Sequence, residues 1–286
     1  MTAQILDGKR IAQRVQDEVR AGAAAFHAQH GRQPALHLTL VGNDPASLRH
    51  VMSKVRQCEG VGLKGVMHPL PHALDQTALL AHVAQLNQAA DVDGILVQLP
   101  LPAPLSAAAV MDAIDPAKDV DGLTPFSAGL LALGRPKLVP CTPAGCLRLI
   151  DEVGLELAGK RALVIGRSAL VGRPTAALLA ARDATVTLAH SRTQGLAELV
   201  AAADVLISAA GQAGLVPGAW IKPGACVIDV GLNRDAEGKL CGDVEFAAAC
   251  ERAAHITPVP GGVGPLTVAM LLVNTLRAAR ERAAAF

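Results

Sequence analysis

The sequence predicts an α/β protein of two domains, each built on a parallel sheet covered by helices. Three observations predict it. Strand-like and helical apolar patterns alternate along the chain, a segment rich in Gly and Pro interrupts them near the middle, and 286 residues are too many for one ordinary domain. The alternation predicts parallel sheets, because each crossover between parallel strands usually carries a helix.

The first half of the chain contains three units of strand followed by helix. A helix over residues 11–30 precedes them, because Ile11, Val15 and Val19 recur at helical spacing. The expected strands are 36–41, 63–68 and 94–98, and the expected helices begin after Asp44-Pro45, near 74–86 and near 106–114. Binding sites of such sheets lie where strands end, here near residues 42–45 and 98–102.

The second half repeats the alternation. Residues 119–143 lack clear periodicity until Thr142-Pro143 starts another helix, so we place the domain join there. The expected strands are 162–165, 184–189, 204–209 and 226–230, and a last helix over 266–285 is expected to pack back onto the first domain. The predicted domains are therefore residues 1–140 with 266–286, and residues 141–265 as a Rossmann-type domain.

Composition and charge argue against several classes of partner. The chain has 26 basic and 25 acidic residues, which argues against binding to nucleic acid or a membrane surface. Its six cysteines include no CxxC pair, so neither a metal site nor a disulfide framework is indicated. The N-terminus has charges where a signal peptide needs an apolar run, and no segment reaches the apolar length of a membrane helix. We expect a cytoplasmic protein without a metal.

The segment 161–174 has the layout of a dinucleotide-binding turn. An apolar strand runs into Gly166-Arg167-Ser168 and then into a helix. Small residues let the backbone approach a pyrophosphate, and the free N–H groups of the helix start can donate to it. The spacing is G-x-S-x-x-x-G and not the general G-x-G-x-x-G, so an ordinary strand-to-helix turn is the alternative.

The end of the next strand indicates which dinucleotide would bind. His190-Ser191-Arg192-Thr193 follows about 20 residues later, where an NAD enzyme usually carries an acid for the ribose hydroxyl. These four positions hold no acid. Ser191 and Arg192 suit a 2′-phosphate and therefore favour NADP over NAD, the alternative being that Arg192 is a solvated surface charge.

A second group of polar residues belongs to the first domain. Ser47, His50 and Lys54 fall at intervals of three and four, hence on one helix face. A lone lysine on a polar face is normally solvated. Lys54 is singled out because Gln98, at the end of a predicted strand, and Asp121 are expected at the same open edge of the sheet.

Taken together, these residues give the chain a resemblance to the bifunctional methylenetetrahydrofolate dehydrogenase/methenyltetrahydrofolate cyclohydrolase family. The family pattern G-R-S-x-x-V-G-x-P also accounts for the unusual glycine spacing. The matching phrases span nearly the whole chain in family order: VGNDPAS (41–47), QLPLP (98–102), KDVDG (118–122), PCTP (140–143), GRS (166–168), IDVG (228–231) and PVPGGVGP (258–265).

The resemblance implies NADP-dependent oxidation of methylenetetrahydrofolate to methenyltetrahydrofolate, followed by hydrolysis to formyltetrahydrofolate, in a homodimer that serves one-carbon metabolism. Lys54 would transfer protons, which requires a pKa lowered towards neutrality. Gln98 would hold the lysine amine, and Asp121 would accept hydrogen bonds from the pterin ring.

The resemblance also implies the remaining site residues. The substrate would be bound by Ser47, His50, Asp121, Pro260, Gly261 and Gly262. The cofactor would be bound by Gly166, Arg167, Ser168, Ser191, Arg192 and Leu232.

The chain departs from the family at His50, where the family pattern has a tyrosine that stacks on the substrate. Imidazole can still stack and donate a hydrogen bond, but it is smaller and can carry a charge. Phe126-Ser127 and Leu130 also stand where the family often has asparagine and arginine.

Two alternatives stay open. The same fold could act on another substrate, as an amino-acid or shikimate-type dehydrogenase does, although the phrases at 98–102 and 258–265 speak against it. A divergent paralogue could instead bind folate or nucleotide with weak or no turnover, and His50 supports that hypothesis.

Overall fold

The computed structural model describes residues 2–284, which divide into two compact units. One unit comprises the residues up to Gln13, Leu131–Arg135 and Pro140–Met270. The other comprises Arg14–Leu130, Pro136–Val139 and the residues from Leu271 onward. The division falls within the first helix, α1 (Gly8–His30), and the last, α10 (Val263–Ala283). Among residues 2–284, no helix combines the length and apolarity that a membrane crossing needs.

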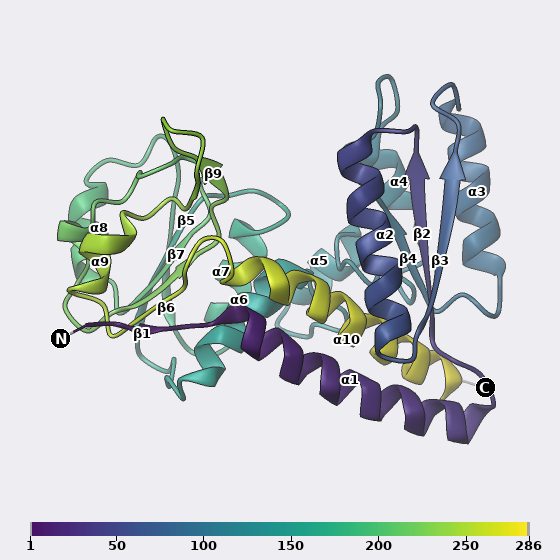
Figure 1. Cartoon of the computed structure of the whole chain (residues 1–286), viewed down its shortest axis with the longest axis horizontal. Helices are drawn as coiled ribbons and strands as arrows, with labels where there is room; N and C mark the ends of the chain where they lie inside the picture. Colours follow the sequence, from purple (N-terminus) through teal and green to yellow (C-terminus); the bar gives the residue numbers. More distant parts are fainter. Residues whose placement is uncertain (1, 285–286) are drawn as a thin grey trace. The chain divides into compact units, whose positions relative to one another are not determined.

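The unit that contains Arg14–Leu130 is built on a parallel sheet in the order β3-β2-β4. Its strands are β2 (Ala35–Val41), β3 (Lys64–Leu70) and β4 (Gly94–Val97). Helix α2 (Pro45–Gly60) covers one face, and α3 (Gln76–Gln88) with α4 (Ala107–Ala113) covers the other (Figure 1). The predicted strands and helices are therefore present here, with ends that differ by one or two residues.

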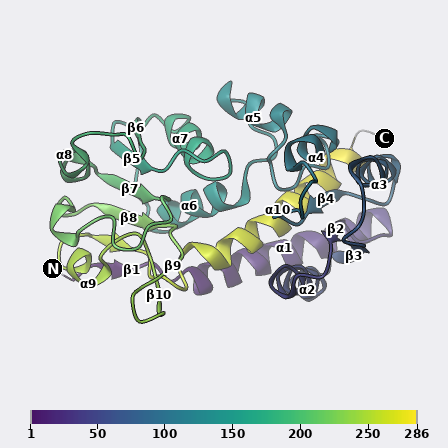
Figure 2. The same cartoon turned by 90° about the horizontal axis from the view of Figure 1, so that it is seen from above.

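The other unit is a Rossmann-type parallel sheet. Within residues 2–284 its six strands lie in the order β1-β11-β8-β7-β5-β6. The four longer strands are β5 (Arg161–Ile165), β6 (Thr185–Ala189), β7 (Val205–Ser208) and β8 (Cys226–Asp229), seen in succession in Figure 2. The next strand of the chain lies on one side of β5 and the one after it on the other. The strand order thus reverses at β5, which is where open α/β sheets bind ligands.

Shorter elements complete this unit. They are α6 (Cys141–Glu152), α7 (Gly172–Ala180), α8 (Leu196–Ala202), the 3₁₀ helix η1 (Gly218–Trp220), the antiparallel pair β9 (Asn233–Arg234) and β10 (Leu240–Cys241), and α9 (Phe246–Cys250). The sequence grouped the first residues with the first domain, but β1 (Gln4–Ile5) pairs with β11 (His255–Ile256) at the edge of this Rossmann-type sheet. A two-residue strand has no periodicity from which its sheet could be predicted.

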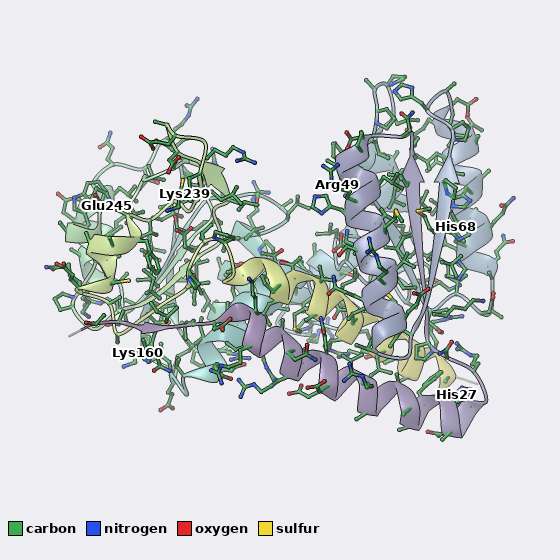
Figure 3. The ribbon with its side chains drawn as sticks, in the orientation of Figure 1. His27, Arg49, His68, Lys160, Lys239 and Glu245 are labelled. Atoms are coloured by element: carbon green, nitrogen blue, oxygen red, sulfur yellow. The ribbon has the colours of Figure 1, made fainter. Side chains whose placement is uncertain are left out.

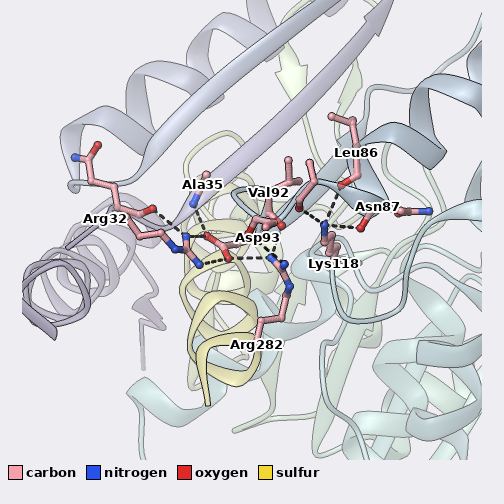
Figure 4. A network of polar contacts seen from close by, with 11 residues as sticks. Arg32, Ala35, Leu86, Asn87, Val92, Asp93, Lys118 and Arg282 are labelled. Atoms are coloured by element: carbon pink, nitrogen blue, oxygen red, sulfur yellow. Dashed lines mark hydrogen bonds and ion pairs between the residues drawn. The ribbon is translucent and has the colours of Figure 1, made fainter. Parts of the chain in front are cut away.

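One buried carboxylate ties together three segments of the β2–β4 unit (Figure 4). Asp93 has 0% exposure and accepts two hydrogen bonds from Arg32, at 2.6 and 2.8 Å. It also accepts one from Arg282 of α10 at 3.0 Å and one from the backbone N–H of Ala35 at 2.9 Å. A buried charge is tolerated when it is paired and hydrogen-bonded, so Asp93 joins the C-terminal helix to the start of β2.

The phrase KDVDG contains two residues with structural roles. Lys118 is buried and donates to three carbonyls at the end of α3, those of Leu86, Asn87 and Ala89, at 2.7–2.9 Å. A cation at that position satisfies carbonyls that a helix end leaves without partners. Burial lowers the pKa of Lys118 to about 8.

Asp119, also buried, accepts from the N–H groups of Leu123 and Thr124 and from the Ser127 hydroxyl. These contacts hold the start of α5 (Pro125–Ala132), a helix that the sequence did not predict. Lys118 and Asp119 therefore build the frame around the half-buried Asp121.

His37, His68 and His82 meet between the β2–β3 strands and α3. His37 Nδ1 lies 2.9 Å from His68 Nε2, and the His68 and His82 rings meet edge to face with centroids 5.1 Å apart; Figure 3 labels His68 on β3. Burial lowers the pKa of each ring, that of His37 to about 4. The charges of His68, Lys64 and Lys118 lower the pKa of His37 further, and that of Asp91 opposes them.

We expect acid to destabilise this unit through the cluster. As the pH falls below about 6.5, the unfolded chain binds protons that the folded histidines do not, so the free energy of unfolding decreases. The loss levels off below the folded pKa, about 4 for His37. His37→Leu should reduce the difference in denaturation midpoint between pH 7 and pH 5. It also removes a buried Nε2 that has no hydrogen-bond partner among residues 2–284.

The matched control is His27→Leu, because His27 is an exposed histidine on α1. The control should keep the wild-type difference between the two pH values. Equal pH dependence of wild type and His37→Leu would contradict the explanation.

Candidate functional site

The turn after β5 requires glycine at two positions. Gly166 has φ +110°, and a Cβ there would lie 2.2 Å from the carbonyl oxygen of Ala209. A Cβ on Gly172 would lie 1.9 Å from the carbonyl oxygen of Gly166. Both distances are shorter than any non-bonded carbon–oxygen contact. The strand, the turn and α7 can therefore pack this closely only if positions 166 and 172 carry no side chain.

A cavity of about 470 Å³ opens at the carboxyl ends of β5, β6 and β7. This volume is in the range of small-molecule sites. Of the predicted cofactor residues, Gly166, Arg167, Ser168 and Ser191 line it, and Arg192 directly follows Ser191 as an exposed residue. The cavity is further lined by Ile165, His190, Thr193, Leu196, Ala209, Ala210, Gln212 and Leu215.

The loop after β6 is held by its own hydrogen bonds. The backbone N–H of His190 donates to Thr193 Oγ1 at 2.9 Å, and that of Arg192 donates to His190 Nδ1 at 3.2 Å. This arrangement leaves the side chains of Ser191 and Arg192 exposed. A hydroxyl and a guanidinium exposed side by side can bind an anionic group such as a phosphate.

Ser168 has a role within the turn that the sequence did not predict. Its hydroxyl accepts hydrogen bonds from the N–H groups of Val171 and Gly172, at 3.1 and 3.4 Å. The side chain therefore binds the backbone where α7 begins and holds the turn in its observed shape.

A second cavity of the same unit, of about 410 Å³, brings Leu232 together with the predicted substrate residues Pro260, Gly261 and Gly262. Its glycine-rich wall packs on the start of α1, where a Cβ on Gly8 would lie 1.7 Å from the carbonyl oxygen of Gly262.

Several lining residues of this cavity were not predicted as site residues, among them Lys9, Thr142 and Thr267. The hydroxyls of Thr142 and Thr267 lie 3.0 Å apart. Only the position of Thr142 in the PCTP phrase could have pointed to them.

In the other unit, Lys54 and Gln98 are in direct contact. Lys54 Nζ donates to Gln98 Oε1 at 2.9 Å, and Gln98 Nε2 donates to the carbonyl oxygen of Leu99 at 2.6 Å. The second bond fixes the amide with its oxygen towards the lysine. An uncharged amide oxygen can orient an amine whether or not the amine is protonated, so this contact is compatible with a lysine that gains and loses a proton.

Helix α2 sets the position of Lys54. Asp44 caps the helix by accepting from the N–H of Ser47 at 2.7 Å, and this bond holds the pKa of Asp44 below its usual value. Ser47 is buried, His50 is exposed and Lys54 is half-buried. Because four residues separate them on α2, His50 lies one helical turn before Lys54.

Both units match one family. Residues 6–121 match the family model described as the tetrahydrofolate dehydrogenase/cyclohydrolase catalytic domain, and residues 140–283 match the NAD(P)-binding domain of the same family. A protein of Sorangium cellulosum named bifunctional protein FolD is 62% identical over 285 residues, which cover 99% of either chain.

Solved structures agree with this match. The bifunctional methylenetetrahydrofolate dehydrogenase/cyclohydrolase of Campylobacter jejuni superposes with a TM-score of 0.95 at 40% identity, covering 98% of this chain and 99% of that one. The Trypanosoma brucei enzyme, solved with NADP and an inhibitor, has a TM-score of 0.92 at 41% identity, covering 98% of each chain. These matches exclude an amino-acid or shikimate-type dehydrogenase. The chain belongs to the tetrahydrofolate dehydrogenase/cyclohydrolase family.

Proposed function

We propose that this chain oxidises methylenetetrahydrofolate with NADP and then hydrolyses methenyltetrahydrofolate to formyltetrahydrofolate. The observation that carries the proposal is the contact between Lys54 Nζ and Gln98 Oε1, at 2.9 Å, in a chain that matches the family over both units. It is tested by adding methylenetetrahydrofolate and NADP to the purified protein and following NADP reduction and methenyl hydrolysis. Binding of both ligands without either reaction would instead support a paralogue that has lost turnover.

The cofactor residues in this proposal are Gly166, Arg167, Ser168, Ser191, Arg192 and Leu232. The close-packed turn at Gly166 suits a pyrophosphate, since small residues and the start of α7 leave room for it. NADP, when bound, accepts a hydride from the methylene carbon of the substrate. Ser191 and Arg192 would bind the 2′-phosphate that distinguishes NADP from NAD.

Lys54 would carry protons in the hydrolysis. Water adds to the methenyl carbon and loses a proton, and the ring nitrogen gains a proton as its bond to that carbon breaks. The remaining hydroxyl proton leaves as the formyl C=O forms, so that one proton is released overall. A single amine can accept the first proton and donate the second if its pKa is near neutrality. Gln98 would hold the amine, and Asp121 would accept hydrogen bonds from the pterin N–H groups.

Ser47, His50, Pro260, Gly261 and Gly262 complete the proposed substrate set, with residues 1–140 and 266–286 as the folate-binding domain and 141–265 as the NADP-binding domain. A homodimer in the cytoplasm is proposed on the family resemblance, and the near-neutral charge supports the absence of nucleic-acid and membrane partners.

Lys54→Ala should abolish hydrolysis of methenyltetrahydrofolate, with a loss of about 100-fold or more, because general acid–base groups contribute factors of that size. NADP affinity should stay the same, since the proposed cofactor residues lie elsewhere. The absorbance of the methenyl compound gives the rate. Arg56→Ala, which removes an exposed cation from the same helix, is the control. Normal hydrolysis by Lys54→Ala would refute the assigned role.

His50→Tyr should leave turnover unchanged or improve it. A phenol ring offers a larger stacking surface and stays neutral beside a cationic intermediate, whereas imidazole can become charged. The measurement is kcat and KM for both reactions. A large loss would show that the histidine has a role of its own in this chain.

Arg192→Ala should raise the KM for NADP by roughly 10- to 100-fold, the value expected for a charge-assisted hydrogen bond, and should leave that for NAD nearly unchanged. Reduction of the two cofactors is compared side by side. The control is Arg182→Ala, since Arg182 is an exposed arginine whose partner is Asp151. If both cofactors are affected equally, Arg192 does not read the 2′-phosphate.

A further inference from the structure

A buried carboxylate lies behind one wall of the cavity that Gly166 borders. Asp243 has 0% exposure. From the described part of the chain it accepts five hydrogen bonds. The donors are Ser208 Oγ at 3.1 Å, the backbone N–H groups of Ala210, Gly211 and Gln212 at 2.7, 3.3 and 2.9 Å, and Asn233 Nδ2 at 2.9 Å. Burying a carboxylate costs free energy unless such donors surround it, and buried N–H groups need an acceptor. Asp243 and the loop 209–212 therefore stabilise each other.

These contacts determine which groups the loop 209–212 presents to the cavity. Ala210 and Gln212 line the cavity, yet their N–H groups point to Asp243. The carbonyl oxygen of Ala209 packs against the α-carbon of Gly166. This wall therefore supplies side chains and carbonyl oxygens, and its three consecutive amides are already engaged.

Asp229 holds Asp243 in turn. Its carboxylate accepts from the N–H groups of Gly231, Asp243 and Val244, at 2.9, 3.1 and 2.8 Å. A Cβ on Gly231 would lie 2.1 Å from Asp243 Oδ1, and one on Gly242 would lie 2.0 Å from Asp229 Oδ2. The two acids thus interlock through glycines that leave no room for a side chain, and the position of the Asp243 carboxylate is fixed.

We propose that Asp243 is a positioning residue for cofactor binding, which shapes the wall 209–212 and turns its amides away from the bound dinucleotide. The proposal rests on the assignment of this cavity to NADP. The phosphates of the cofactor then take their backbone donors from the turn after Gly166, and the wall 209–212 contacts the uncharged parts.

The test uses Asp243→Asn, which keeps the shape of the side chain but replaces one acceptor oxygen with an NH₂ group facing N–H donors. The KM for NADP should rise about tenfold or more, because buried donors lose their acceptor. Hydrolysis of methenyltetrahydrofolate, which consumes no NADP, should stay within twofold of wild type. Val227→Ala, a core substitution in β8 of the same sheet, is the control for lost stability and should leave the KM unchanged.

A second variant covers the case in which Asp243→Asn does not fold. Gly211 has φ +69°, and a Cβ added to it would have nothing within 4 Å, so Gly211→Ala strains the loop without a clash. It should also raise the KM for NADP and spare hydrolysis. Gly238→Ala, with φ +80° and equally open space in the β9–β10 turn, is the matched control.

The outcomes separate the two proposals. Unchanged NADP affinity in Asp243→Asn, or in Gly211→Ala if the first variant does not fold, overturns the role of Asp243. An equal loss of NADP reduction and methenyl hydrolysis also overturns it, since that indicates general damage to the protein. Gly166→Ala tests the cavity itself: if this variant binds NADP normally, the cofactor assignment fails, whatever Asp243 does.

Discussion

The close approach of two strand ends determines the structure around the turn at Gly166 in the NAD(P)-binding domain. β5 and β7 are neighbours, and the chain leaves their carboxyl ends in turns that touch at Gly166 and Ala209. Only glycine fits there, and only glycine at 172 lets α7 begin directly above the turn. The Ser168 hydroxyl then accepts hydrogen bonds from the backbone where that helix begins. The position of the cavity and the start of α7 follow from this packing.

Buried carboxylates repeatedly fix backbone in this chain, in both units. Asp93 holds the start of β2, Asp119 holds the start of α5, and Asp229 and Asp243 hold the loops beside the cavity at Gly166. Each accepts N–H groups that would otherwise be buried without partners. This explains why motifs rich in Asp and Gly recur at strand ends here. Many of these acids shape the backbone, as Asp119 does two positions before the half-buried Asp121.

The sequence predicts the longer elements well because their apolar residues form runs or recur at strand or helix spacing. β2 is buried along its whole length, and its apolar run is visible without any structure. β1 and β11 have two residues each, so neither shows a periodic pattern, and α5 has only eight residues.

The site residues also divide into those that a local sequence pattern reveals and those that it does not. Lys54 and Gln98 are found from a helix face and a strand end, which local patterns reveal. The donors to Asp243 lie 10 to 35 residues away, and Lys9 reaches its cavity from the other end of the chain, so only the folded structure brings them together.

The departure from the family pattern at His50 concerns only the substrate side of the proposed chemistry. His50 belongs to the unit that carries the Lys54–Gln98 contact, whereas the turn at Gly166 and the Ser191-Arg192 pair belong to the other. A change at position 50 should therefore act on folate stacking and on the charge beside the methenyl cation. It leaves the packing that forms the cavity at Gly166 intact. A substitution of this kind should change how the chain binds its substrate, and it should not change which dinucleotide the chain uses.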